Sequence, residues 1–203
     1  QVTIIQDGEA FIPREDAEVA AAVYDNLLSR GITILKKAQT LSVRDEADCA
    51  VLTVLADGRE QRIEADAVLV AAGRRPNLAG LNAEAAGVAL TERGAVRTDE
   101  HLQTSVPHIW AMGDVVGGLQ FTYISLDDFR IVKSALLGDG SRTTANRGAV
   151  PYTVFLDPPL SRVGLSEAEA AAGGLDYRIA KLPAAAIPKA QVLKQPAGLL
   201  KAI

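Results

Sequence analysis

The residues best suited to chemistry in this sequence are a glycine and an acid, Gly113 and Asp114, which separate an apolar segment from a helix-like one. Residues 109–112 predict a short buried strand, and residues 121–137 predict a helix that begins at Thr122. A carboxylate accepts hydrogen bonds from hydroxyl groups, and a helix N-terminus offers unpaired N–H groups with partial positive charge. This combination predicts a site for a polar cofactor, with a plain turn aspartate as the structural alternative.

The composition predicts an ordinary soluble protein. The chain has 203 residues, of which 48% are hydrophobic and 23% charged. Its net charge of −4 is spread without blocks, which argues against binding to nucleic acid or a membrane surface. No apolar run approaches the ~18 residues of a membrane span, and no signal-peptide pattern is present. The single cysteine, Cys49, excludes an intrachain disulfide and fits a reducing compartment, so we expect a cytoplasmic protein.

Metal chemistry is not expected. The two histidines, His101 and His108, have no cysteine or histidine partner at metal-ligand spacing. Cys49 has no basic neighbour or helix N-terminus that would lower the pKa of its thiol, so we expect an inert side chain.

Both ends of the chain resemble interrupted strands. The sequence opens on the apolar residues 2–5 without a methionine and stops within the strand-like residues 199–203. Natural termini are usually polar and loosely ordered. We therefore expect a segment of a longer protein.

The first third of the sequence predicts an α/β domain. Residues 2–5 and 32–35 have the all-apolar or β-branched character of parallel strands, and between them a helix begins near Pro13 and ends at Gly31. An antiparallel insertion of three strands follows, at residues 41–43, 51–55 and 61–63, with a turn at Asp57 and Gly58. Residues 66–72 then predict a further parallel strand.

The remainder predicts short strands, a linker and an α+β region. Residues 88–90 and 95–97 are expected to be short strands around a turn, and residues 138–148 a polar linker. Ser166 and Glu169 predict the capped start of a helix. Further strands are expected in the last region, at residues 153–156, 177–182, 190–193 and 199–203.

Three stretches together resemble one family. Val68-Leu-Val-Ala-Ala-Gly-Arg-Arg-Pro-Asn77 resembles the segment that leaves a nicotinamide-binding domain, and Ile109-Trp-Ala-Met-Gly-Asp114 resembles a second FAD motif. The segment from Pro151 to Glu167 resembles the start of a dimerisation domain. The chain is thus similar to the pyridine nucleotide-disulfide oxidoreductases, flavoprotein reductases that include glutathione reductase, lipoamide dehydrogenase and mercuric reductase. The run from Gly118 to Asp128 is most similar to the mercuric-reductase-like branch, which includes reactive-chlorine-resistance enzymes.

The resemblance implies a fold and its divisions. The expected fold is α/β, a partial two-dinucleotide-binding, Rossmann-like fold followed by the start of an α+β dimerisation domain. Residues 1–75 would be part of the NAD(P)-binding domain, residues 76–147 the C-terminal part of the FAD-binding domain, and residues 148–203 the N-terminal part of the dimerisation domain.

The resemblance also assigns a flavin site. Gly113 and Asp114 would bind FAD, with the carboxylate accepting from a ribitol hydroxyl. The backbone at Phe121, Thr122 and Tyr123 would face the pyrimidine edge of the flavin. Reduced flavin carries negative charge near that edge, and a helix N-terminus favours such charge by about 0.3–1 kcal/mol.

The nicotinamide nucleotide, NAD(P)H, is assigned less completely. Gly73 would let the backbone approach it, although a glycine that simply ends a strand is the alternative. Gln6 follows the first strand, where related proteins often carry an acid that binds the adenosine ribose. Because the residue there is neutral, the sequence does not decide between NADH and NADPH. Asp7, the next residue, is an alternative for the role of the acid. Arg74 and Arg75 fit solvated loop charges equally well.

By resemblance, the longer parent is a homodimer that passes electrons from NAD(P)H through FAD to a disulfide or thiol pair, or to a small-molecule or metal-ion acceptor. Its Gly-x-Gly-x-x-Gly motifs, redox cysteine pair and His-Glu couple are not found among these residues. We therefore expect no catalytic residue here, no turnover by this chain alone, and weak or absent FAD binding. Two alternatives stay open: a non-enzymatic nucleotide-binding or oligomerisation module, and an NADH oxidase or transhydrogenase without the cysteine pair.

Overall fold

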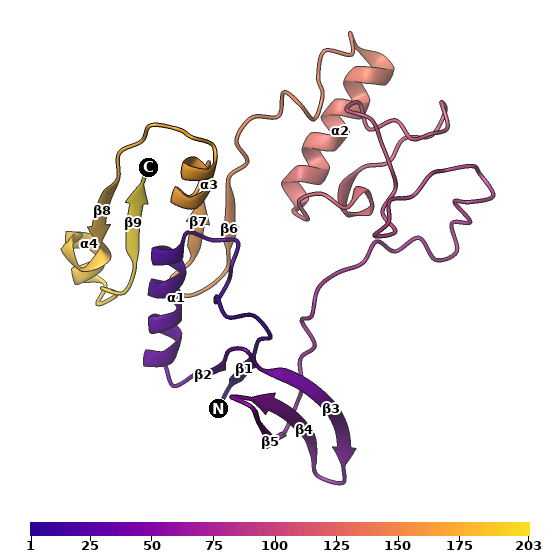
Figure 1. The fold of residues 1–203 in the computed structure, drawn as a ribbon. Coiled ribbons are helices and arrows are strands. Elements are labelled where there is room, and N and C mark those ends of the chain that lie inside the picture. The colour runs from indigo at the N-terminus through magenta and orange to yellow at the C-terminus, as the bar shows by residue number, and fades with distance from the viewer. The chain divides into compact units, whose positions relative to one another are not determined.

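The computed structural model describes all 203 residues and divides them into two compact units (Figure 1). The first unit consists of residues 1–70 together with residues 151–203, and the second of residues 71–150. No helix in the structure combines the length and apolar character needed to cross a membrane.

The first unit opens with the predicted β-α-β arrangement. Strands β1 (Thr3–Ile5) and β2 (Thr33–Leu35) pair in parallel, and helix α1 (Ala17–Ser29) connects them. Asp16 caps the helix, because its carboxylate accepts from the backbone N–H of Glu18 at 3.1 Å. The chain turns out of the helix at Gly31 in the left-handed region, at φ +79°. The order of strand, helix and strand and the helix end at Gly31 are confirmed, but the helix begins at Ala17 and not near Pro13.

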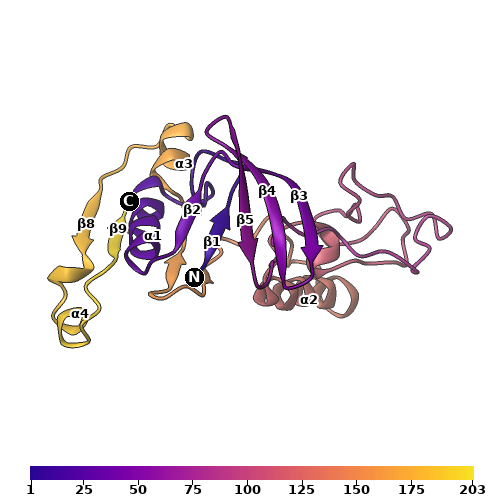
Figure 2. The same cartoon turned by 90° about the horizontal axis from the view of Figure 1, so that it is seen from below.

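The predicted insertion forms a three-stranded antiparallel sheet, visible as three adjacent arrows in Figure 2. Strand β4 (Cys49–Ala56) lies between β3 (Gln39–Glu46) and β5 (Arg59–Ala65). Alternate residues of β4 are buried, and Val54 is fully buried, so one face of this sheet carries the main apolar core of the unit. This insertion is confirmed.

The C-terminal part of the first unit is made of short elements. Its helices and strands are β6 (Tyr152–Val154), β7 (Leu160–Arg162), α3 (Glu167–Ala172), β8 (Ala180–Pro183), the 3₁₀ helix η2 (Ala184–Ala186), α4 (Pro188–Val192) and β9 (Leu199–Ala202). The strands form two antiparallel pairs, β6 with β7 and β8 with β9. The capping box at the start of α3 is present, with reciprocal hydrogen bonds between Ser166 and Glu169.

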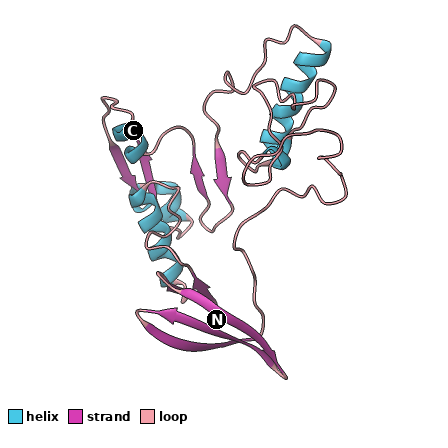
Figure 3. Cartoon of the chain, turned by 45° about the vertical axis from the view of Figure 1, so that its right-hand side comes forward, coloured by secondary structure: helices cyan, strands magenta, loops and turns pink.

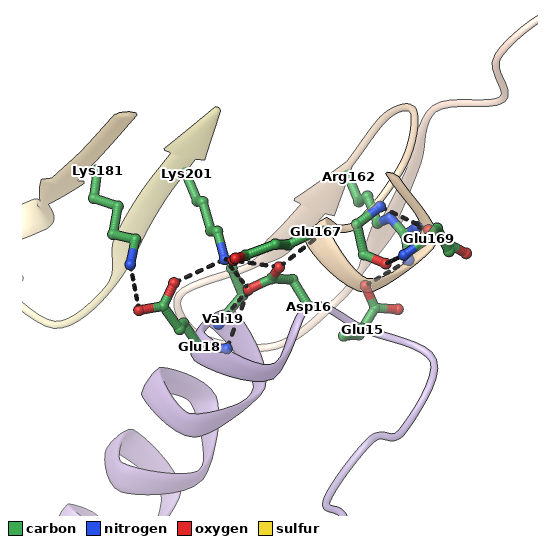
Figure 4. A network of polar contacts seen from close by, with 10 residues as sticks. Glu15, Asp16, Glu18, Val19, Arg162, Glu167, Glu169, Lys181 and Lys201 are labelled. Atoms are coloured by element: carbon green, nitrogen blue, oxygen red, sulfur yellow. Dashed lines mark hydrogen bonds and ion pairs between the residues drawn. The ribbon is translucent and has the colours of Figure 1, made fainter. Parts of the chain in front are cut away.

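A buried lysine joins these short elements to helix α1. The ammonium of Lys201, on β9, lies 2.9 Å from Asp16, 2.7 Å from Glu18 and 2.6 Å from Glu167 (Figure 4). The Lys201 side chain is only 3% exposed. We call Lys201, Asp16, Glu18 and Glu167 the Lys201 cluster. Since it connects the N-terminus of α1 with α3 and β9, it holds together segments that are far apart in the sequence.

Two strand predictions in the first half of the chain are wrong or incomplete. Residues 66–72 form no strand, and Leu69 and Val70 are 90% and 80% exposed. The apolar pattern is that of a buried strand, but no neighbouring strand pairs with this backbone. Residues 88–90 and 95–97 meet only in one isolated bridge, between Leu90 and Val96, instead of forming strands.

Two further predictions are corrected in later segments. Residues 190–193 belong largely to helix α4 rather than to a strand, because Pro188 occupies its first turn, where a proline favours a helix start. Residues 109–112 form a single bridge from Trp110 to Gln103 and not a continuous buried strand, and Met112 is half-exposed.

The second unit contains little regular structure apart from one long helix, as Figure 3 shows. That helix is α2 (Thr122–Leu137), preceded by the 3₁₀ helix η1 (Gly113–Val116). The predicted helix start at Thr122 is confirmed. The predicted linker, residues 138–148, is more ordered than expected, because its arginines Arg142 and Arg147 form ion pairs with α2.

Candidate functional site

The second unit contains a cavity of about 420 Å³ at the junction of η1 and α2. Four of the five predicted flavin-binding residues line it, and Tyr123 is the exception. The lining residues are Arg74, Met112, Gly113, Asp114, Gln120, Phe121, Thr122, Ser125 and Phe129. The structure thus brings together the glycine, the acid and the helix start that the sequence places nine residues apart at most.

Gly113 is required by its conformation and by its surroundings. Its φ is +75°, in the left-handed region, and a Cβ at this position would lie 2.9 Å from the Oγ of Ser125. Gly117, which ends η1 at φ +80°, is similarly constrained, because its Cβ would lie 2.7 Å from that of Ala95. The turn that presents Asp114 therefore lies close to Ser125 of α2 at Gly113 and close to Ala95 at Gly117.

The carboxylate of Asp114 is available to a ligand. Asp114 lies in the first turn of η1 and is exposed. Its backbone oxygen accepts from the N–H of Gly117 at 3.1 Å, but its carboxylate makes no hydrogen bond or ion pair within the chain. An acidic group that caps no helix and pairs with no cation can accept from hydroxyl groups outside the chain.

The N-terminus of α2 adds hydrogen-bond donors beside this acid. Its N-cap residue is Phe121, in an extended conformation at φ −130°, and its side chain provides no capping hydrogen bond. The first N–H groups of the helix, beginning at Thr122, are therefore not capped by a side chain. The rings of Phe121 and Tyr123 stack at 5.1 Å between centroids, and partial burial raises the pKa of the Tyr123 phenol above its ordinary value. The phenol is therefore neutral at physiological pH.

Sequence reasoning missed part of this site. Asp128 of α2 accepts a hydrogen bond from the backbone N–H of Gly113, and Arg74, for which a solvated loop charge was an equal alternative, lines the cavity. A signal for Asp128 was present in the sequence. Ile124, Asp128 and Ile131 follow helical spacing, so an acid falls on the buried face of α2 and requires a partner.

The two residues predicted to contact NAD(P)H lie in different units. Gln6, in the first unit, donates from its side-chain amide to the backbone oxygens of Gly8 at 3.2 Å and Ala10 at 2.5 Å, so it holds the loop after β1. Gly73, in the second unit, has φ +117° with open space where a Cβ would stand. The amide oxygen of Gln6 has no donor within the chain and stays available as an acceptor.

A larger cavity of about 540 Å³ lies in the first unit, between α1 and the β8–β9 pair. Its lining is mostly apolar, with Val23, Leu27, Leu182 and Leu199 among its residues, and contains no carboxylate. None of the predicted cofactor-binding residues takes part in it. The smaller cavity, in which an unpaired acid and helix donors converge, is therefore the candidate site.

Comparison with known families decides the assignment. Residues 1–128 match the sequence model of the pyridine nucleotide-disulphide oxidoreductases, and residues 150–203 match that of their dimerisation domain. The chain belongs to the pyridine nucleotide-disulphide oxidoreductase family. The expected α/β fold, with the beginning of a dimerisation domain after it, is thereby confirmed.

Relatives in this family match the chain from end to end. The probable pyridine nucleotide-disulfide oxidoreductase RclA of Escherichia coli is 45% identical over 203 residues, which are 100% of this chain and 45% of that protein. Mercuric reductase of Staphylococcus aureus is 36% identical over 100% of this chain and 37% of its own length. These two relatives bear out the expected similarity to the mercuric-reductase-like and reactive-chlorine-resistance branch.

A solved structure gives the same result. The Cu(II) complex of HOCl-induced flavoprotein disulfide reductase RclA from Escherichia coli superimposes with a TM-score of 0.92 at 44% identity, covering 100% of this chain and 45% of that one. The chain therefore spans less than half the length of the family members described here. Their activities belong to proteins more than twice as long.

Proposed function

We propose that this chain supplies about half of an NAD(P)H-dependent flavoprotein reductase, in which electrons pass from NAD(P)H through FAD to a disulfide or thiol pair or to a metal-ion acceptor. The support is family membership together with relatives named as a disulfide oxidoreductase and a mercuric reductase. Within this proposal, residues 1–75 belong to the NAD(P)-binding domain, residues 76–147 to the FAD-binding domain and residues 148–203 to the dimerisation domain.

The cavity of the second unit fits part of a flavin nucleotide. Bound flavin supplies the chemistry of accepting a hydride and passing its electrons on. The unpaired Asp114 carboxylate suits a polyhydroxyl chain such as ribitol, and the N–H group at Thr122, which lines the cavity, suits the carbonyl and nitrogen acceptors of the pyrimidine edge. The N–H of Tyr123, the next residue of the helix start, is assigned to the same edge. The absence of a Cβ at Gly113 keeps the turn close to α2, so that acid and donors face one cavity.

The observation that carries the assignment is the unpaired carboxylate of Asp114 beside the uncapped start of α2. The electrostatic consequence is that the helix end stabilises negative charge, while Asp114 fixes the neutral hydroxyl-bearing part of the ligand. Gln6 and Gly73 are assigned to NAD(P)H in the same proposal. The oxygen of Gln6 would accept from a ribose hydroxyl, and its neutrality would not repel a phosphate.

The experiment is substitution of Asp114 in the whole flavoprotein. Asp114→Ala should weaken FAD binding about 10- to 100-fold, the loss of a hydrogen bond to a charged group, in a titration of apoprotein with FAD. The unfolding midpoint of the apoprotein should not change, because the carboxylate contacts nothing within the chain. Asp48→Ala, at an exposed turn between β3 and β4, is the control and should bind FAD as the unmodified protein does. Equal FAD affinity for Asp114→Ala and the control would contradict the assignment.

The dimerisation segment supports a homodimer as the state of the whole protein. We place the protein in the cytoplasm, because its single cysteine fits a reducing compartment. Sedimentation of the whole flavoprotein tests the dimer, since a species with the mass of one chain at micromolar concentration would contradict it.

A further inference from the structure

Helix α2 carries two adjacent buried acids. Asp127 and Asp128 are 8% and 3% exposed, although both stand in the middle of the helix. Buried carboxylates are costly unless each oxygen has a partner. The identity of those partners shows what each acid does.

Asp127 and Asp128 have different partners. Asp127 contacts only arginines: its oxygens accept from Arg142 at 2.6 Å and from Nε of Arg147 at 2.8 Å. Burial raises the pKa of Asp127, but the hydrogen bonds from the two arginines outweigh this effect and hold the pKa below its ordinary value. Asp127 therefore ties residues 142–147 to the helix and does not reach the cavity.

Asp128 contacts the turn formed by Gly113 and Asp114 in the candidate flavin site. Its Oδ2 accepts from the backbone N–H of Gly113 at 2.8 Å, and its Oδ1 accepts from Nη2 of Arg147. Gly113 itself is left-handed and follows the extended Met112, and no backbone oxygen accepts from its N–H. The Asp128 carboxylate therefore fixes the Met112–Gly113 peptide, one residue before Asp114, and Arg147 fixes the carboxylate.

We propose that Asp128, held by Arg147, is a positioning residue that orients the Gly113–Asp114 turn toward the ribitol of the flavin. The inference rests on the proposed function and adds a residue outside the cavity lining. It distinguishes Asp128 from Asp127, which is also a buried aspartate and has an arginine in common with it, but makes no hydrogen bond to the turn.

The first test measures the Gly113 contact without flavin. Amide hydrogen exchange of the 203-residue chain, followed by NMR, should show a protected Gly113 N–H. Asp128→Ala should accelerate its exchange about 10- to 100-fold, as expected for loss of a hydrogen bond to a charged group. Asp127→Ala should leave Gly113 within about twofold of the unmodified chain, because Asp128 keeps its contact with Nη2 of Arg147, while Arg142 and Nε of Arg147 lose their partner. Equal exchange in the two alanine variants would overturn the proposal.

A conservative variant separates positioning from the ion pair. In Asp128→Asn the side-chain oxygen still accepts from Gly113, but the charge that pairs with Arg147 is gone. Asparagine should therefore restore most of the Gly113 protection that alanine loses. If the role were only to balance Arg147, asparagine would be no better than alanine, and that result would also overturn the proposal.

The second test uses the whole flavoprotein and a titration of its apoprotein with FAD. Asp128→Ala should weaken FAD binding about tenfold, Asp128→Asn less, and Asp127→Ala by no more than about twofold. Loss of Gly113 protection with unchanged FAD affinity would overturn the link to the flavin. A whole protein that binds no FAD even without substitution would instead overturn the proposed function, while the exchange results would still decide whether Asp128 fixes the turn.

Discussion

Gly113 shows how a single residue without a side chain determines the candidate site. An alanine there would combine a left-handed backbone with a contact of 2.9 Å to Ser125. The backbone strain alone costs about 1–2 kcal/mol, and the overpacked contact adds about 1–3 kcal/mol. We therefore expect Gly113→Ala to lower the unfolding free energy of the second unit by about 2–5 kcal/mol, measured by urea denaturation.

Gly94 provides the matched control within the same unit. Its φ is +77°, but nothing lies within 4 Å of its hypothetical Cβ. Gly94→Ala should therefore lower the unfolding free energy only by the strain, about 1–2 kcal/mol. If the two variants lost the same free energy, the close approach to Ser125 would have no energetic role.

For single residues, the sequence was sufficient to identify those whose role follows from their residue type and their neighbours in the chain. It was not sufficient for those whose role depends on a contact with a distant residue. Asp114 and Thr122 are recognisable because a glycine, an acid and a helix start are adjacent in the chain. The pairing of Asp128 with Gly113 and Arg147 joins residues that are 15 and 19 positions apart. This pairing depends on the path of the chain through residues 138–147, and local sequence propensity does not predict that path.

Among the elements, the Lys201 cluster determines how β9 is attached to α1. Lys201→Met would remove the cation that contacts all three acids, Asp16, Glu18 and Glu167. Breaking a buried ion pair costs about 3–5 kcal/mol, but Glu18 and Glu167 are 44% and 39% exposed, so solvent screens part of this loss. We expect a decrease of about 2–3 kcal/mol in the unfolding free energy of the first unit.

Lys181→Met is the control for that prediction. Lys181 pairs with Glu18 at 2.6 Å, but both side chains are 44% exposed. An exposed pair contributes about 0–1 kcal/mol, so the control should unfold almost as the unmodified chain does. A similar loss in both variants would mean that burial of Lys201 adds nothing to its stabilising effect.

The same cluster predicts a dependence of stability on pH. Burial raises the pKa of Asp16, but the hydrogen bonds from Lys201 and from the backbone of Glu167 and Glu18 outweigh it, so the pKa is lowered. Burial lowers the pKa of Lys201, but its hydrogen bonds to Glu167, Glu18 and Asp16 outweigh this effect and raise it.

A lowered carboxyl pKa gives stability that is present above the unfolded value, about 3.9, and is lost as the pH falls through the folded value. A raised lysine pKa gives stability that is present below about 10.4 and is lost as the pH rises through the folded value. The free-energy difference between the unmodified chain and Lys201→Met should therefore be constant from about pH 5 to 9 and shrink below about pH 4. Urea denaturation at stepwise pH measures it. A difference that grew with acid would contradict the assigned ion pairs.

The elements that the sequence predicted correctly are those whose partners are close in the chain. The β1–α1–β2 unit, the hairpins of β3, β4 and β5, and the capped start of α3 are stabilised by contacts within a few tens of residues. Residues 66–72 have the composition of a buried strand, yet a strand exists only where another backbone accepts its hydrogen bonds. That requirement lies beyond any local pattern.

For the whole molecule, the extent of the chain relative to its family limits what it can bind. It spans 45% of the RclA protein, and its candidate flavin cavity presents one carboxylate and one helix start, with Asp114 and Thr122 exposed. Sites that hold a nucleotide-sized ligand usually bury about 70–90% of its surface. The contacts that this chain offers are too few for that.

We therefore expect the 203-residue chain to lose FAD during desalting, whereas the whole flavoprotein keeps it. The chain is incubated with excess FAD, passed through a desalting column, and analysed for visible flavin absorbance per chain. Asp114→Ala, treated in the same way, measures non-specific carry-over. Because binding that buries little surface leaves the cost of association uncompensated, flavin should remain at the level of this control. Flavin retained at about one per chain in the unmodified protein, and lost in Asp114→Ala, would show that the acid and the helix start suffice for binding.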